Sequence, residues 1–340
     1  MTTEPAIAPS VRVIDRALLD RLDGLQAHLE ANIIGQPEVI PEVVKTIKNA
    51  ELGFTEAGEP RSAFLFLGPT GVGKTEVTLQ FTEYVCGPGK LIRLDMSEFM
   101  NLDAVGLLIG TPSDNPEVRR GLLGKYYDRT GGTGTLLFDE IEKAHRQVQD
   151  LFLQILDASR ITLGNGETLD LSRMFLVATS NIGSQMLMHS RTRNRETIVR
   201  RVQTEAKGQM RPEIYARFHP VVVFNRLDFD AQRNIARVHL AKVLRHMARL
   251  GHRLDVDDSV LGPIIDRGYS EELGARPMRN AARAAVREAV REAVFARDAG
   301  HGTLRYDRLG QRFFLDHSSS PVVSTSTGQT NPAALATEPL

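Results

Sequence analysis

Residues Gly68–Thr75 read Gly-Pro-Thr-Gly-Val-Gly-Lys-Thr and directly follow the apolar run Ala63–Leu67, Ala-Phe-Leu-Phe-Leu. This is a complete phosphate-loop pattern, G-x-x-x-x-G-K-[ST], between a strand-like run and a helix-like segment. Backbone N–H groups in such a turn, together with the positive end of the helix dipole, bind phosphate groups. Lys74 is predicted to reach the β- and γ-phosphates, and the Thr75 hydroxyl to ligate Mg²⁺. The predicted contacts of this loop are Gly68, Pro69, Thr70, Gly71, Val72, Gly73, Lys74 and Thr75.

A second motif, Leu136-Leu137-Phe138-Asp139-Glu140, ends an apolar run with two acids. Ligands of open α/β sheets bind at the carboxyl ends of the strands, so we expect both carboxylates beside the phosphate loop. Asp139 is predicted to hold Mg²⁺ through its water shell, and Glu140 to polarise the water that attacks the γ-phosphate. The expected cofactors are ATP and Mg²⁺.

The composition sets wider bounds. A chain of 340 residues predicts one large domain and a smaller one. Its 42 basic and 42 acidic residues leave no net charge, which disfavours nucleic acid or an anionic membrane as a general partner. The only cysteine, Cys86, cannot form an internal disulfide, and no signal peptide or apolar run of roughly 18 residues is found. These features predict a soluble, cytoplasmic protein without membrane insertion.

The periodicity of apolar residues predicts a parallel α/β domain over residues 31–226. Residues 1–30 form a lead segment whose helix carries a leucine stripe at Leu18, Leu22, Leu25 and Leu29, and a second helix is expected from Val39 to Ala50. Short apolar runs alternate with helical segments, which is typical of parallel strands covered on both faces. Besides the run before the phosphate loop, the expected strands are 91–94, 135–138, 174–178 and 221–224.

Residues 227–316 are predicted to form a smaller, mainly helical domain. Helical apolar stripes run through 235–247 and 286–294, and a hairpin around Gly310 is expected from 303–306 and 312–315. A second hairpin, over 163–169, is predicted to turn through Asn165-Gly166 as type I′. Residues 317–340 are rich in Ser, Thr, Pro and Ala, which predicts a disordered tail.

These motifs resemble the C-terminal ATPase module of Clp-type AAA+ proteins, the ClpA and ClpB unfoldases and disaggregases. The resemblance rests on Phe64–Thr75 and on Leu136–His145, Leu-Leu-Phe-Asp-Glu-Ile-Glu-Lys-Ala-His, and covers roughly residues 29–315. It implies an AAA+ P-loop fold, with a parallel sheet flanked by helices and a helical lid, that works as a homo-oligomeric ring, expected to be a hexamer. Further matches in chain order are Ile33-Ile34-Gly35-Gln36, Asp95–Glu98, Thr179–Ser184, Arg211–Glu213 with Arg217, and Gly274–Pro277.

The resemblance also implies roles for single residues. Ile33 and Ile34 match the box that lies beside adenine. Asn181 is expected to be the sensor that orients the attacking water beside Glu140. Arg217 is expected to be an arginine finger that enters the neighbouring subunit's site, and Arg276 to touch the γ-phosphate in its own subunit. A finger accelerates hydrolysis by about 10³–10⁵, so a monomer is expected to hydrolyse ATP poorly.

Three groups of residues keep open interpretations. Arg211 either shares the finger role or braces its loop. The cluster at residues 191–201 either contacts nucleic acid or forms a solvated linker face, and the absence of net charge favours the solvated face. His145 is interpreted as structural, because the histidines show no metal-ligand spacing with cysteine and His145 is a motif residue of the helix expected after Glu140. The arginines of the cluster are Arg191, Arg193, Arg195, Arg200 and Arg201.

One stretch departs from the family pattern. Where Clp unfoldases carry a Gly-aromatic-Val-Gly pore loop, residues 111–117 read Thr-Pro-Ser-Asp-Asn-Pro-Glu, with Asn115 near the position of the aromatic ring. Grip on an arbitrary polypeptide needs large apolar contact, so processive threading is not expected from this loop. Tyr126 and Tyr127 either substitute for the ring or pack their helix against the sheet, and packing is favoured.

Three functions follow from these observations. We favour an ATP-driven remodeller of a dedicated protein client or adaptor, acting as a minimal ring with one ATPase module. The alternative is a nucleotide-gated assembly switch or scaffold that threads nothing. A nucleic-acid motor or loader is disfavoured, because Asp114 and Glu117 make the expected pore acidic. No Ile-Gly-Phe or Ile-Gly-Leu tripeptide lies between Ser184 and Arg211, which disfavours docking onto a barrel peptidase.

Overall fold

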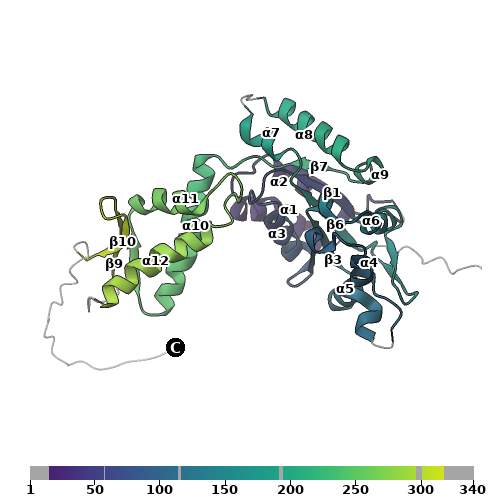
Figure 1. Ribbon diagram of the computed structural model, residues 1–340, viewed down its shortest axis with the longest axis horizontal. Helices are drawn as coiled ribbons and strands as arrows, with labels where there is room; N and C mark the ends of the chain where they lie inside the picture. Colours follow the sequence, from purple (N-terminus) through teal and green to yellow (C-terminus); the bar gives the residue numbers. More distant parts are fainter. Residues whose placement is uncertain (1–14, 57, 114–115, 191–193, 296–300, 318–340) are drawn as a thin grey trace, which may run out of the picture.

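The computed structural model describes residues 15–317, except for residues 57, 114–115, 191–193 and 296–300. These residues form a larger α/β part and a smaller part of helices and a short sheet (Figure 1). The predictions about residues 1–14 and about the tail at 318–340 concern parts of the chain outside this description.

The core of the larger part is a five-stranded parallel sheet, with strand order β2-β3-β6-β1-β7. Three of its strands, β1, β3 and β6, are buried along their whole length. Strands covered on both faces carry nearly continuous apolar runs, and this explains the patterns seen in the sequence. The predicted parallel sheet is confirmed, with strands β1 Ser62–Leu67, β2 Leu91–Asp95, β3 Gly134–Asp139, β6 Met174–Ser180 and β7 Val221–Val223.

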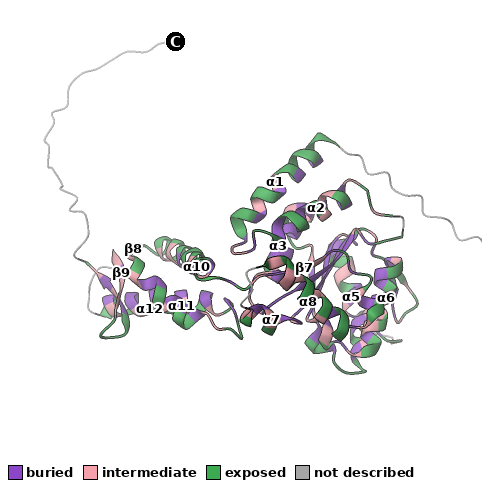
Figure 2. Ribbon diagram, turned by 90° about the horizontal axis from the view of Figure 1, so that it is seen from above, coloured by how far each residue is buried: buried purple, intermediate pink, exposed green. Residues whose placement is uncertain are grey.

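Side chains of successive strand residues enter two different cores. Phe64 and Phe66 belong to one core, and Leu65 and Leu67 to the other. The first core is covered by α1 Arg16–Asn32, α2 Val39–Glu51 and α3 Lys74–Cys86 (Figure 2). The second is covered by α4 Ala104–Ile109, α5 Pro116–Thr130, α6 Arg146–Ala158, α7 Ser184–His189, α8 Arg195–Gln209 and α9 Pro212–Tyr215. Across the described residues, no helix is long and apolar enough to cross a membrane.

The lead helix α1 confirms the leucine stripe. Asp15 caps it by accepting a hydrogen bond from the Leu18 N–H at 2.8 Å. The four leucines of the stripe are all buried, because their spacing places them on one face of the helix. The helix therefore packs onto the larger part through this single face.

The hairpin at 163–169 exists, between β4 Arg160–Thr162 and β5 Thr168–Asp170, but its predicted turn type is wrong. A type I′ turn needs positive φ at both central residues, and only Gly166 has one, at 84°, whereas Asn165 does not. The chain turns one residue earlier, where the Gly166 N–H donates to the Leu163 carbonyl at 2.9 Å. The Asn165 side chain instead accepts from the Glu167 N–H at 3.0 Å, which stabilises this alternative turn.

Tyr126 and Tyr127, which follow the loop at residues 111–117, pack against the larger part. Tyr126 and Tyr127 are half-buried on α5 and contact the second core. Their rings are thus occupied inside the larger part. Within the loop at residues 111–117, residues 114–115 lie outside the described residues.

The smaller part contains α10 Phe229–Arg249, α11 Leu261–Gly268 and α12 Met278–Phe295 around a three-stranded sheet. The predicted hairpin is confirmed as antiparallel β9 His301–Asp307 and β10 Arg312–Asp316. A third strand, β8 Arg253–Val256, pairs in parallel with β9 and was not predicted, nor was α11. The run Arg-Leu-Asp-Val is too short to signal a strand without its partner.

Candidate nucleotide-binding site

The phosphate loop connects β1 directly to α3. Gly68, Gly71 and Gly73 have φ values of 142°, 70° and 109°, which side chains on L-residues rarely adopt. The helix begins at Lys74 without a side-chain cap, so its first N–H groups are open to an anion. The predicted phosphate-binding turn is therefore present in the structure, at the N-terminus of a 13-residue helix.

The amine of Lys74 lies inside this turn. Lys74 is 7% exposed, and its Nζ donates to the carbonyls of Gly68 and Pro69 and to Asn181 Oδ1, the last at 2.9 Å. Burial lowers the pKa of Lys74 to about 8, against the opposing effect of Asp139. A phosphate would stabilise the charged form of this amine, because its negative charge offsets the hydration that the amine loses on burial.

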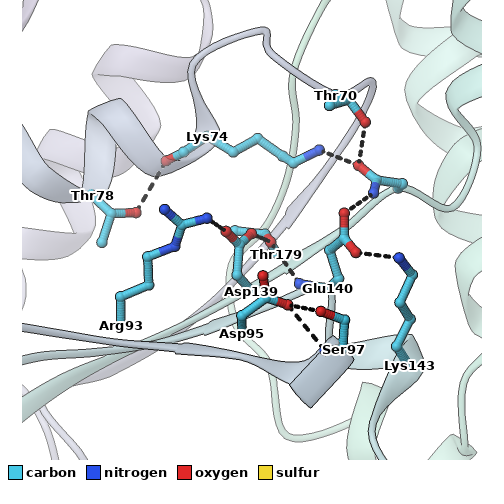
Figure 3. Close-up of polar contacts among 11 residues, drawn as sticks. Thr70, Lys74, Thr78, Arg93, Asp95, Ser97, Asp139, Glu140, Lys143 and Thr179 are labelled. Carbon is cyan, nitrogen blue, oxygen red and sulfur yellow. Dashed lines mark hydrogen bonds and ion pairs between the residues drawn. The ribbon is translucent and has the colours of Figure 1, made fainter. Parts of the chain in front are cut away.

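The two acids stand at the end of β3 and differ in their surroundings (Figure 3). Asp139 is buried; it accepts a hydrogen bond from the Thr179 hydroxyl on Oδ1 and pairs with Arg93 on Oδ2 at 2.5 Å. Glu140 has left-handed φ and ψ of 59° and 52°, a conformation that costs a non-glycine residue about 1 kcal/mol. This turn directs its carboxylate away from that of Asp139 (Figure 3).

Asn181 connects the phosphate loop to Glu140. Its Nδ2 donates to Glu140 Oε1 at 3.0 Å while its Oδ1 accepts from Lys74. Its backbone N–H donates to Glu142 Oε1 at 3.0 Å, and Lys143 pairs with the other oxygen of Glu140 at 2.5 Å. No role was predicted for Glu142 or Lys143, because their contacts depend on where β6 ends relative to β3.

The smaller part closes the site as a lid. A cavity of about 330 Å³ lies between the two parts. Its phosphate-loop wall includes the predicted residues Thr70, Gly71, Val72, Gly73, Lys74 and Thr75, together with Asp139, Glu140 and Asn181. Ile33 and Ile34 line it as well, whereas Gly68 and Pro69 are not among its lining residues. The lid contributes Ile235, Val238, His239, Lys242, Ala275, Arg276 and Arg279.

The lid residues divide by chemistry. Ile235 on α10 and the predicted Ile33 and Ile34 supply apolar surface, which suits the flat face of a base. Arg276 and Arg279, near the start of α12, supply positive charge, which suits phosphate. Only Arg276 of the lid residues was predicted. Ile235, Val238, His239 and Lys242 were missed because one face of α10 packs the lid while neighbouring positions line the cavity.

The donor set fits a magnesium ion. Thr75 and Asp139 line the same cavity, and Mg²⁺ prefers hydroxyl and carboxylate oxygens together with phosphate oxygens. Within the described residues, no cluster of three or more His, Cys, Asp or Glu side chains is suited to hold a metal by itself. His145, interpreted as structural, caps α6 by accepting from the Gln147 N–H at 3.3 Å.

The other predicted arginines lie away from this cavity. Arg217 pairs with Asp157, and its side chain is 42% exposed. Arg211 pairs with Asp150 at 2.6 Å and with Glu213. Both aspartates belong to α6, so the two arginines are anchored to the outer surface of the larger part. In the 191–201 cluster, Arg191 and Arg193 lie outside the described residues, and Arg195 donates to the Val223 carbonyl at 3.1 Å and to Asn225.

The geometry defines an α/β protein with a phosphate loop, two acids after a buried strand, an asparagine that links the loop to one of these acids, and a lid. Comparisons with known proteins assign this class to a family. The family model AAA domain (Cdc48 subfamily) matches residues 59–221, and the model C-terminal, D2-small domain, of ClpB protein matches residues 227–304. The chain belongs to the Clp-type AAA+ ATPases.

Individual relatives support the same family. The chaperone protein ClpB of Aquifex aeolicus (strain VF5) is 35% identical over 279 residues, which cover 79% of this chain and 28% of the relative. A ClpA homologue of Pyropia yezoensis, an ATP-binding subunit of an ATP-dependent Clp protease, is 36% identical over 275 residues, covering 77% and 34%. This chain thus spans about a third of the length of these relatives.

A solved structure gives the same result for the fold. A closed-state reconstruction of Hsp104 with ATPγS and FITC casein superposes with a TM-score of 0.77 and 25% identity. The superposition covers 89% of this chain and 52% of the Hsp104 chain. The predicted AAA+ fold with a helical lid is confirmed.

The position of His239 in the lid predicts that the affinity for the nucleotide depends on pH. In the free pocket, the pKa of His239 is lowered from 6.5 by burial and by the charges of Lys242, Arg279 and Arg283, against Glu76. A bound triphosphate adds negative charge and raises this pKa, so binding takes up a proton. Affinity for the nucleotide should therefore rise as the pH falls through the pKa that His239 has in the complex, and this gain is lost as the pH rises above it.

The measurement is the affinity for a fluorescent, non-hydrolysable ATP analogue at pH about 5.5 and about 7.5. Because the nucleotide also titrates, His239→Gln supplies the reference, and wild type should gain about two- to fivefold more affinity on acidification. Equal pH dependence of the two proteins would contradict a nucleotide-facing role of His239.

Proposed function

We propose that this chain is the ATPase module of a cytoplasmic ring, expected to be a hexamer, that hydrolyses ATP to remodel or disassemble a protein partner. The observation that carries the proposal is the continuous polar connection from Lys74 through Asn181 to Glu140. It places a phosphate-binding amine and a carboxylate base on the two sides of one amide, within the cavity that the lid closes.

Within this proposal the residues of the large part divide the work. Lys74 and the loop N–H groups bind the β- and γ-phosphates, and Thr75 and Asp139 hold Mg²⁺. The ion, when bound, neutralises charge on the phosphate oxygens. Glu140 accepts the proton of the attacking water, and Asn181 orients that water by its amide. The contacts of Asn181 to both neighbours support this assignment.

The lid and the adenine side complete the site. Ile33, Ile34 and Ile235 are proposed to enclose the adenine ring, and Arg276 to contact the γ-phosphate of its own subunit. Their presence around one cavity supports these roles. Arg276 directly follows a backbone contact between the lid and the phosphate loop, since residues 273–275 approach Gly71 and Thr70 closely.

A neighbouring subunit is proposed to supply the remaining positive charge. Arg217 does not line the cavity of its own chain and is exposed on the outer surface. Both features support insertion into an adjacent site as an arginine finger, with Asp157 as its holder between turnovers. Arg211 has two acidic partners and is proposed to brace the segment that carries Arg217.

Removal of the amine and of the base should separate binding from hydrolysis. We expect Lys74→Ala to lose nucleotide affinity by at least about 100-fold, because it removes a buried charge-assisted contact to phosphate. We expect Glu140→Gln to keep affinity and to lose turnover by about 10²–10⁴. Nucleotide binding and phosphate release are measured on the same preparations, with exposed Lys207→Ala as the control. Normal turnover by Glu140→Gln would remove that residue from the water-activating role.

Mixed rings test the finger. Arg217→Ala subunits keep intact cavities, and Lys74→Ala subunits keep intact fingers, so mixing the two inactive proteins should restore part of the hydrolysis. The rate is followed against mixing ratio, and native mass spectrometry verifies that mixed rings form. An absence of rescue in verified mixed rings would contradict a finger that acts between subunits.

Stimulation of ATP hydrolysis separates the remodeller from its alternatives. A native protein partner should stimulate turnover severalfold, whereas an unfolded model protein should have a weaker effect, because residues 111–117 lack an aromatic ring. Single-stranded DNA should have none, since the chain has no net charge. Stimulation by DNA would favour a nucleic-acid motor, and ATP-dependent assembly without stimulation by any polymer would favour a switch.

A further inference from the structure

The carboxylate proposed to hold magnesium already has a cation beside it. Arg93 lies on β2, outside both sequence motifs, and its Nη2 is 2.5 Å from Asp139 Oδ2 (Figure 3). The Thr179 hydroxyl donates to the other oxygen of the same carboxylate. The side chain of Asp139 is 5% exposed, against 46% for Arg93, so a guanidinium reaches from the surface to a buried acid.

The sheet makes this contact possible. Strands β2 and β3 are parallel neighbours, and Asp95 is in register with Asp139. Arg93 is two residues before Asp95 and therefore on the same side of β2. From this position its long side chain extends toward the carboxyl edge of the sheet, where the phosphate loop and both acids are located (Figure 3).

A metal ion and this guanidinium compete for one carboxylate. Both are cations, and each is stabilised by the negative charge of Asp139 while it repels the other. Because Asp139 is buried, solvent screens this repulsion less than it would at the surface. The presence of Arg93 therefore weakens the binding of a second cation at this position.

We propose that Arg93 acts as an internal counterion of Asp139, which the metal–nucleotide complex must displace, and that this exchange sets the magnesium affinity of the site. The inference rests on the proposed function, since it concerns the same metal position. It makes Arg93 a positioning residue: Arg93 is not among the residues that line the cavity, and it acts through its contact with Asp139.

Asp95 is a second acid with which the displaced guanidinium of Arg93 can pair. Asp95 is on the same side of β2, and its carboxylate accepts hydrogen bonds from the N–H and hydroxyl of Ser97, at 3.0 and 2.6 Å. Burial tends to raise the pKa of Asp95, but the Ser97 bonds and the charges of Arg93 and Lys143 outweigh it, so the net pKa is lowered. Asp95 is thus an ionised partner within the influence of Arg93, and exchange between the two acids leaves no guanidinium without a counterion.

The test measures metal binding without hydrolysis. Mn²⁺ replaces Mg²⁺ as an electron paramagnetic resonance probe and is titrated into the nucleotide-free protein. Arg93→Gln should bind Mn²⁺ about tenfold more tightly than wild type, and Arg93→Met, which keeps side-chain length without charge, should behave alike. Arg93→Lys should stay close to wild type. The double variant Arg93→Gln with Asp139→Asn should lose the gain, and exposed Arg245→Gln on α10 serves as the matched control.

A second measurement is the Mg²⁺ concentration that half-saturates binding of a non-hydrolysable ATP analogue, which should fall by a similar factor in Arg93→Gln. Unchanged or weaker metal binding in folded Arg93→Gln and Arg93→Met would overturn the inference, because it would mean that Arg93 only orients the carboxylate. Failure of wild type to bind nucleotide would instead reject the proposed function, and the Mn²⁺ comparison would still decide the role of Arg93.

Discussion

The amide of Asn181 is the contact on which the arrangement of the site depends. It accepts from the buried amine of Lys74 and donates to Glu140, so it fixes the distance between the phosphate loop after β1 and the acids after β3. These two strands do not touch, because β6 lies between them in the sheet. Asn181 follows β6 and spans that gap. The residue that follows the central strand thus links the segment after β1 to the segment after β3.

Local patterns were sufficient to predict the elements that carry this site. A strand buried on both faces is a continuous apolar run, and among the strands of the described residues this property belongs to β1, β3 and β6. A turn with φ of 70° at Gly71 and 109° at Gly73 can be predicted from its glycines, because few other residues adopt those angles. The roles of Asn181, Arg217 and Arg276 came from the family resemblance, and their placement relative to the cavity came from the structure.

Contacts between strands were beyond the reach of the sequence. Arg93 contacts Asp139, and Glu142 contacts the backbone of Asn181, only because of the register in which neighbouring strands pair and the positions at which they end. Such partners carry no local signal, since an arginine in a strand or a second acid after a strand is common on a protein surface. The turn type predicted at Asn165 is wrong for a related reason. The hydrogen bond that the Asn165 side chain accepts from the Glu167 N–H competes with the backbone geometry that Asn-Gly favours.

The lid meets the phosphate loop through backbone rather than through side chains. The Ala275 N–H donates to the Gly71 carbonyl at 3.3 Å, and a Cβ on Gly71 would lie 2.3 Å from the Leu273 carbonyl oxygen. A Cβ on Gly274 would likewise lie 2.2 Å from the Thr70 carbonyl oxygen. The phosphate loop and the segment that carries Arg276 are therefore in direct backbone contact. Gly71 in the phosphate loop and Gly274 in the lid therefore allow the two backbones to approach this closely.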